Sequence, residues 1–156
     1  MTQVPESGNP EGVRHPARVL GIAGCVPFAV LSLWLFGIAD DHPWRSGTIA
    51  LLTGYSAVLL SFLGGIRWGL ALAERNAEGA RLELTLGILP ALVGWAALAI
   101  TVPYAFAVLA VAFAAQGASD ALAIHGGAAP AWFGRLRSQL TLVAVAAMIL
   151  AFVATG

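Results

Sequence analysis

The stretch Tyr55-Ser-Ala-Val-Leu-Leu-Ser-Phe-Leu-Gly-Gly-Ile-Arg-Trp-Gly69 combines, within one apolar segment, the features that decide the fold of this chain. The segment is long enough to cross a membrane, yet it contains the charged residue Arg67 and two adjacent glycines, Gly64 and Gly65. Because an ionised side chain is costly inside a bilayer, a charge at membrane depth commonly marks a functional site or a specific partner. The stretch therefore predicts a membrane-spanning helix with one charged position to be explained.

The composition of the whole chain is that of an integral membrane protein. Its 156 residues are 59% hydrophobic and 10% charged, and the mean hydropathy is +0.84, whereas soluble domains carry about 25% charged residues. The net charge is zero, and no basic patch suggests binding of a nucleic acid. The one cysteine, Cys25, excludes an internal disulfide and a cysteine-based metal site.

Five apolar runs follow one another along the chain, so we expect an all-α membrane protein, a bundle of five transmembrane helices. A run of about 20 apolar residues is needed to cross about 30 Å of hydrocarbon. The expected spans are residues 19–38, 48–73, 82–101, 105–124 and 136–154. They form one transmembrane domain, residues 18–156, and the polar residues 1–17 are expected to be a disordered tail. The last helix should begin near Pro130, because proline suits the first turn of a helix.

The arginines outside the spans are distributed unevenly between the two sides of the predicted bundle. If the N-terminus is cytoplasmic, Arg45 lies outside, beside two aspartates, and six arginines lie inside. These six are Arg14, Arg18, Arg75, Arg81, Arg135 and Arg137. Since cytoplasmic segments carry an excess of basic residues, we expect a cytoplasmic N-terminus and a C-terminus on the outside.

Arg67 and Asp120 are predicted to meet near the cytoplasmic end of the bundle. Arg67 lies about 10 Å, and Asp120 about 8 Å, from that end of their helices, at about 1.5 Å per residue. Since a buried charge is tolerated when it is paired and hydrogen-bonded, we expect the two side chains to pair, directly or through a water. Gln116 lies one turn before Asp120 on the same helix face, and Trp68 follows Arg67.

Three interpretations of this polar site are open. The pair could clamp two helices and fix their register, since polar contacts inside membranes often serve packing. It could instead bind an anionic headgroup or a proton-linked group, because charges inside membranes often mark function. The third alternative is that the charged side chains reach the interface without pairing.

Small residues recur every four positions in the second span, at Ser61, Gly65 and Gly69. Such a stripe lets another helix approach closely, so we expect helix packing on this face and, through it, a homo-oligomer or a membrane-protein partner. Gly64 beside Gly65 would also leave room for a ligand ring or a headgroup. The second span therefore has one face for packing and another for its charge.

The start of the fifth helix is predicted to lie at the membrane interface. Trp132 belongs to a helical stripe of apolar residues, and an amphipathic first turn of this kind lies flat against the headgroup region. Arg135 and Arg137 are expected to snorkel toward the headgroups.

The sequence contains no catalytic or metal-binding motif that we can recognise. The histidines, at His15, His42 and His125, lack the helical i, i+4 spacing of a metal pair. No phosphate-binding loop and no nucleophile elbow occurs, and Ser61 has no evident base. We therefore expect no catalytic residue, no metal site and no resident cofactor beyond a bound lipid or quinone, and we favour a non-enzymatic role.

The pattern Tyr55-Ser-Ala-x-x-Leu-Ser-Phe-Leu-Gly-Gly-x-Arg-Trp-Gly69 resembles the signature of an uncharacterised membrane family, the transmembrane protein 69-like domain of unknown function 3429 (DUF3429). Pro130-Ala-Trp-Phe-x-x-Leu-Arg-x-x-Leu-Thr141 resembles the second motif of that family. The resemblance implies a small bundle of about five helices in a bacterial or mitochondrial inner membrane, and it implies no established reaction. Family members often have histidine at the position of Arg67, which implies a polar or cationic group there.

We interpret the chain as a multi-pass protein of the bacterial inner membrane with a non-enzymatic role in packing, assembly or interaction. Its partners would be the lipid bilayer, a second copy or another membrane protein, and no nucleic acid. The main alternative is a lipid- or quinone-binding site near the cytoplasmic leaflet, lined by Arg67, Trp68, Gln116 and Asp120. The third is a proton-coupled carrier, against which the lack of a repeat argues, since many carriers are built from inverted repeats.

Overall fold

The computed structural model describes residues 10–73, 77–125 and 131–156 of the chain. Within them it contains five helices and no strand. They are α1 (Pro10–Gly37), α2 (Arg45–Ala73), α3 (Ala77–Ala97), α4 (Tyr104–His125) and α5 (Ala131–Thr155). Each contains a stretch long and apolar enough to span a membrane, which confirms the expected all-α chain with five candidate spans.

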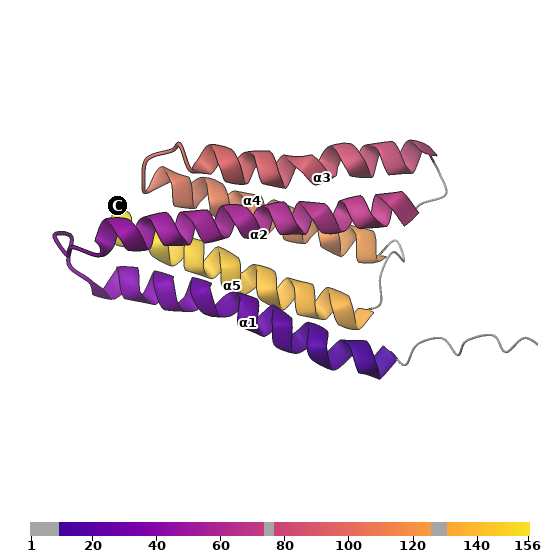
Figure 1. The fold of residues 1–156 in the computed structure, drawn as a ribbon, viewed down its shortest axis with the longest axis horizontal. Helices are drawn as coiled ribbons and strands as arrows, with labels where there is room; N and C mark the ends of the chain where they lie inside the picture. The colour runs from indigo at the N-terminus through magenta and orange to yellow at the C-terminus, as the bar shows by residue number, and fades with distance from the viewer. Residues whose placement is uncertain (1–9, 74–76, 126–130) are drawn as a thin grey trace, which may run out of the picture.

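Consecutive helices run antiparallel, so the chain passes back and forth along one axis (Figure 1). The most extensive contacts are between α2 and α3 and between α4 and α5, which form two helical hairpins. α1 packs mainly on α5 and also meets α2, while α4 contacts both helices of the first hairpin. The start of α1 and the C-terminus lie at opposite ends of the bundle (Figure 1), as an odd number of spans requires.

The first helix begins earlier than its expected span, at Pro10. Residues 10–17 are therefore helical and not part of a disordered tail, while residues 1–9 of that predicted tail lie outside the described residues. Proline suits the first turn of a helix. The Arg14 guanidinium carbon also lies 5.6 Å from the centre of the Trp132 ring of α5, and this cation–π contact holds the polar first turns of α1 against the bundle.

Glycines allow the helices of each hairpin to pack closely. A Cβ built on Gly64 would lie 2.2 Å from the carbonyl oxygen of Gly87, so α2 and α3 can approach this closely only because both residues lack a side chain. Gly94 lies similarly close to the backbone of Ala57 on α2. In the second hairpin, Gly117 of α4 instead makes room for the side chain of Thr141 of α5.

The core is apolar, and the outer surface is apolar as well. Twelve buried hydrophobic residues form one cluster, in which the large side chains are Phe28, Leu35, Leu52, Leu60, Phe106, Leu109, Phe113 and Met148. Many other large apolar side chains point outward from every helix. Lipid tails are as apolar as leucine, so this outer surface is suited to contact with hydrocarbon.

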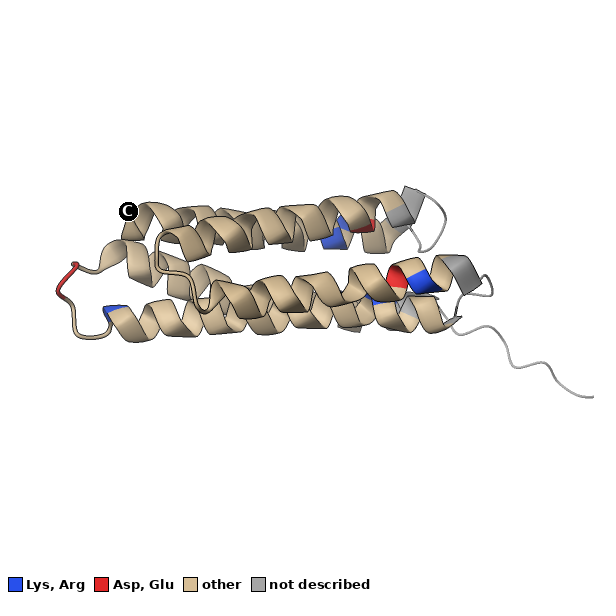
Figure 2. Ribbon diagram, turned by 90° about the horizontal axis from the view of Figure 1, so that it is seen from above, with Lys and Arg blue, Asp and Glu red and all other residues tan. Residues whose placement is uncertain are grey.

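Charged residues gather in two groups, with an uncharged stretch of helix between them (Figure 2). At one end, Arg45 pairs with Asp40 at 2.8 Å and donates hydrogen bonds to the carbonyls of Ile38 and Ala154. Arg45 thereby joins the C-terminal ends of α1 and α5, where carbonyls without helical partners favour a cation. The second group forms the candidate site.

Candidate intramembrane polar site

Two ion pairs lie at the end of the bundle opposite Arg45, and each one joins the two helices of a hairpin. Arg67 of α2 faces Glu83 of α3, with 3.4 Å between Nε and Oε2. Arg137 of α5 pairs through Nη2 with the Oδ2 atom of Asp120 of α4. The two acidic partners therefore neutralise two arginines that lie within the apolar helices.

Additional hydrogen bonds to residues of α4 extend each pair. Arg67 Nη2 donates to the Ser119 hydroxyl of α4 at 2.5 Å, and Gln116 Nε2 donates to Asp120 Oδ1 at 3.0 Å. We call the resulting set the polar layer. Its members, from α3 through α2 and α4 to α5, are Glu83, Arg67, Ser119, Gln116, Asp120 and Arg137.

The polar layer is buried at its centre and more open at Glu83, whose side chain is 37% exposed. Arg67 is 8% exposed and Gln116 is also buried, while the Arg137 side chain is 11% exposed. No buried side-chain nitrogen or oxygen within the described residues lacks a hydrogen-bond partner. A buried charge that is paired and hydrogen-bonded is tolerated in an apolar interior, so the layer satisfies the condition under which these arginines can stay at this depth.

The predicted direct pair between Arg67 and Asp120 is not formed in the structure. Arg67 takes Glu83 and Ser119 as its partners, and Asp120 takes Gln116 and Arg137. Ser119 and Asp120 are neighbours in sequence, but successive residues of a helix point to different faces. Ser119 therefore reaches α2 while Asp120 reaches α5, and among the described residues α4 links the two ends of the predicted pair.

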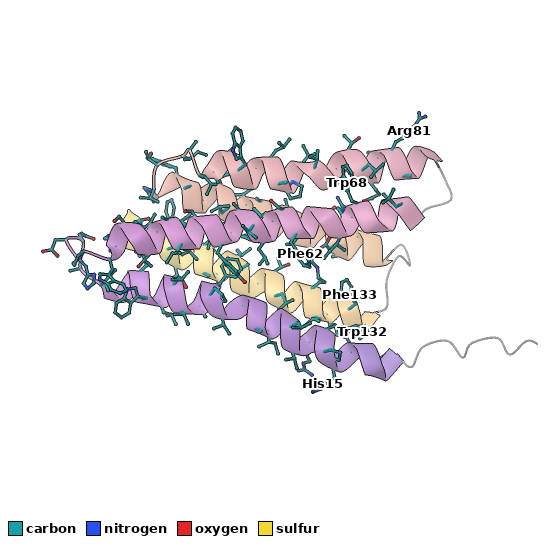
Figure 3. All side chains as sticks on the ribbon, in the orientation of Figure 1. His15, Phe62, Trp68, Arg81, Trp132 and Phe133 are labelled. Carbon is teal, nitrogen blue, oxygen red and sulfur yellow. The ribbon has the colours of Figure 1, made fainter. Side chains whose placement is uncertain are left out.

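The expectation that Arg137 snorkels is also wrong, since its side chain points into the bundle and pairs with Asp120. Arg135 is exposed. Trp132 and Phe133 pack edge to face, with 5.9 Å between ring centres. Figure 3 shows both rings toward the same end of the bundle as Trp68 and Arg81.

The other predicted site residues lie outside the polar layer. Trp68 is partly exposed, and its ring covers Gly87 on α3. Ser61 is exposed and donates to the Ala57 carbonyl of its own helix at 2.9 Å. Gly65 and Gly69 are exposed as well, with open space where a Cβ would be.

Sequence reasoning missed Glu83 and the inward role of Arg137, although a signal for both was present. In an antiparallel helical hairpin, residues equally far from the connection lie at the same height. Arg67 lies seven residues before the segment 74–76, and Glu83 lies seven residues after it. Asp120 and Arg137 are likewise six and seven residues from the segment 126–130. Charges of opposite sign at such mirrored positions identify the pairs.

A cavity of about 300 Å³ lies beside the polar layer, between α1, α2 and α5. Its lining is apolar except for Arg137, Thr141 and the thiol Cys25. None of the residues predicted to line a lipid or quinone site, Arg67, Trp68, Gln116 and Asp120, borders it. Within the described part of the chain, no three His, Cys, Asp or Glu side chains form a group that could hold a metal ion.

The chain matches the family described as "Protein of unknown function (DUF3429)" over residues 13–153. It is 34% identical to transmembrane protein 69 of Xenopus tropicalis over 140 residues, which cover 86% of this chain and 52% of the relative. Transmembrane protein 69 of Mus musculus is 34% identical over 84 residues, which cover 53% of this chain and 33% of the relative. The matched part thus spans about half the length of the Xenopus relative and about a third of the length of the mouse relative. No solved structure matches the chain significantly. With the family matched across nearly all five helices, the chain belongs to the DUF3429 family of membrane proteins.

Proposed function

We propose that the chain is a non-enzymatic assembly module of the bacterial inner membrane, which associates with a second copy of itself through the outer face of α2. The observation that carries the proposal is the open stripe of Ser61, Gly65 and Gly69 on that face. In a membrane, small residues at this spacing let two helices approach closely, so that van der Waals contact drives their association.

The contacts inside the chain support this assignment. The first hairpin uses Gly64 for its close approach and leaves Gly65 and Gly69 unused. Arg67 and Asp120 each form an ion pair inside the chain. This favours the interpretation that they clamp helices together over a ligand-binding site at these two residues. The layer then serves to hold the two hairpins in register while the outer face of α2 remains available.

The proposal includes an orientation. The polar layer and the basic segments around α1, α3 and α5 face the cytoplasm, and the Arg45 end faces outward, in accordance with the positive-inside rule. Reporter fusions at the connection between α2 and α3 should therefore report a cytoplasmic location. Fusions at the connection between α1 and α2 should report the opposite side, and the reverse pattern would contradict this orientation.

Disulfide cross-linking in native membranes tests the proposed dimer. In a Cys25→Ser background, Ser61→Cys should give a covalent dimer on mild oxidation, and adding Gly65→Leu should abolish it. Ala114→Cys is the matched control, because Ala114 is exposed on α4, at a similar distance from the following connection. Equal cross-linking at both positions, none at either, or a cross-link to a different protein would contradict self-association through α2.

A further inference from the structure

We infer that the cavity between α1, α2 and α5 binds an anionic phospholipid, with one acyl chain inside the cavity and the phosphate at Arg137. This inference goes beyond the proposed function and does not depend on it, since the cavity lies between helices of one chain. It also replaces the predicted lipid or quinone site with one built from different residues.

The cavity is long enough for the part of an acyl chain that lies next to the headgroup. Its walls run over residues 17–28 of α1 and residues 133–144 of α5. With the phosphate at Arg137, the α5 wall continues for seven residue steps to Ala144, or about 10 Å, within a leaflet whose hydrocarbon is about 15 Å thick. The volume of about 300 Å³ is at the lower end of the range for ligand sites, which suits one chain of a two-chain lipid.

The cavity opens sideways, toward the surroundings of the bundle. Leu20 of α1 and Phe62 of α2 both line it, and they are 71% and 63% exposed. α1 also diverges from α2 toward its N-terminal end (Figure 1). A lipid can therefore enter from the bilayer with one chain, while its second chain stays outside.

Arg137 is the charged group among the described residues that line the cavity, and it lies nearer the end where α5 begins, whereas Thr141 and the Cys25 thiol lie deeper. Arg137 reaches into the lining from α5, and Thr141 lies one turn further along the same helix. A guanidinium has five N–H donors, and a carboxylate partner such as Asp120 can engage at most two of them in a bidentate pair. The remaining donors of Arg137 can bind a phosphate without breaking its ion pair.

Further cations surround this end of the cavity and favour an anionic ligand. Arg18 follows the lining residue Ala17 and is exposed, and Arg14 stacks on Trp132, next to the lining residue Phe133. Basic pockets between transmembrane helices characteristically bind anionic lipid headgroups. A quinone can accept a hydrogen bond through a carbonyl oxygen, but it carries no negative charge for these arginines to attract.

Native mass spectrometry of the purified chain in mild detergent tests the inference, with phosphatidylglycerol, phosphatidylcholine, oleate and ubiquinone as separate probes. We expect the wild-type chain to retain phosphatidylglycerol at least several-fold better than phosphatidylcholine. Asp120→Asn frees Arg137 and should keep or increase that preference. Asp120→Asn combined with Arg137→Gln replaces the ion pair by neutral amides and should remove it.

A second pair of variants tests the chain-binding part of the cavity independently of the charges. A Cβ on Gly24 would make only ordinary contact, 3.8 Å from the Tyr55 hydroxyl oxygen, so Gly24→Leu should fill the cavity and abolish lipid retention. Ala23→Leu is the control, because Ala23 is exposed on the same helix and outside the lining. Retention of both phospholipids alike, a preference for oleate or ubiquinone, or equal effects of Gly24→Leu and Ala23→Leu would overturn the inference.

Discussion

Replacing Arg67 by methionine tests whether the polar layer holds the two hairpins together. The hydrogen bond from Arg67 to Ser119 is charge-assisted, and bonds of this kind contribute about 1.5–3 kcal/mol. The pair with Glu83 adds less than about 1 kcal/mol, because its atoms are 3.4 Å apart and the Glu83 side chain is 37% exposed. We therefore expect Arg67→Met to lower the free energy of unfolding by about 2–3 kcal/mol.

Double-mutant cycles in detergent-solubilised protein separate these contributions. Arg67→Met combined with Ser119→Ala should give a coupling energy of about 1–2 kcal/mol, while Arg67→Met with Asp120→Asn should be additive within about 0.5 kcal/mol. Reversible unfolding in a denaturing detergent, followed by circular dichroism, measures each variant. Arg135→Met is the control, since Arg135 is exposed and its loss should change stability by less than about 0.5 kcal/mol. A coupling of Arg67 to Asp120 as large as that to Ser119 would refute the partner assignment.

Three further predictions use the same unfolding assay. Exchanging charges in the second ion pair, Asp120→Arg with Arg137→Asp, should recover part of the stability that either single change loses; no recovery would contradict a specific pair. Gly64→Leu should lower the free energy of unfolding by at least about 1–3 kcal/mol, because the new Cβ would meet a carbonyl of α3. Gly65→Leu should leave the stability of the monomer unchanged, because that position faces open space. Equal effects of the two changes would contradict the assignment of Gly64 to packing against α3. Tyr55→Phe should lower the free energy of unfolding by about 1 kcal/mol, because the Tyr55 hydroxyl donates a hydrogen bond to an α1 carbonyl at 2.6 Å. An unchanged free energy of unfolding would argue against that bond.

Much of the architecture can be read from the sequence because the bilayer imposes strong rules on it. Five apolar runs of sufficient length predict five helices, since a chain in hydrocarbon must satisfy its backbone hydrogen bonds internally. The boundaries are harder to predict, as α1 shows. Its first turns are polar, and they are helical where Arg14 packs on Trp132, 118 residues further along the chain.

The structure brings three of the predicted site residues, Arg67, Gln116 and Asp120, into one polar layer, and it gives Arg67 and Asp120 other direct partners than each other. Depth alone cannot say which helix a side chain faces, so it could not show that Ser119 faces α2 while Asp120 faces α5. The hairpin partners Glu83 and Arg137 could have been found from their mirrored distances to the two connections.

The sequence by itself determined the number of spans and the height of each charge, because hydropathy and helical rise depend only on the order of residues along one helix. Tertiary structure alone decided which charges pair, which glycines are used and where the cavity lies. These features depend on how each helix is rotated about its axis and which neighbours it meets. Gly64 and Gly65 show the difference most simply: they are adjacent in sequence, yet one is pressed against α3 and the other faces open space.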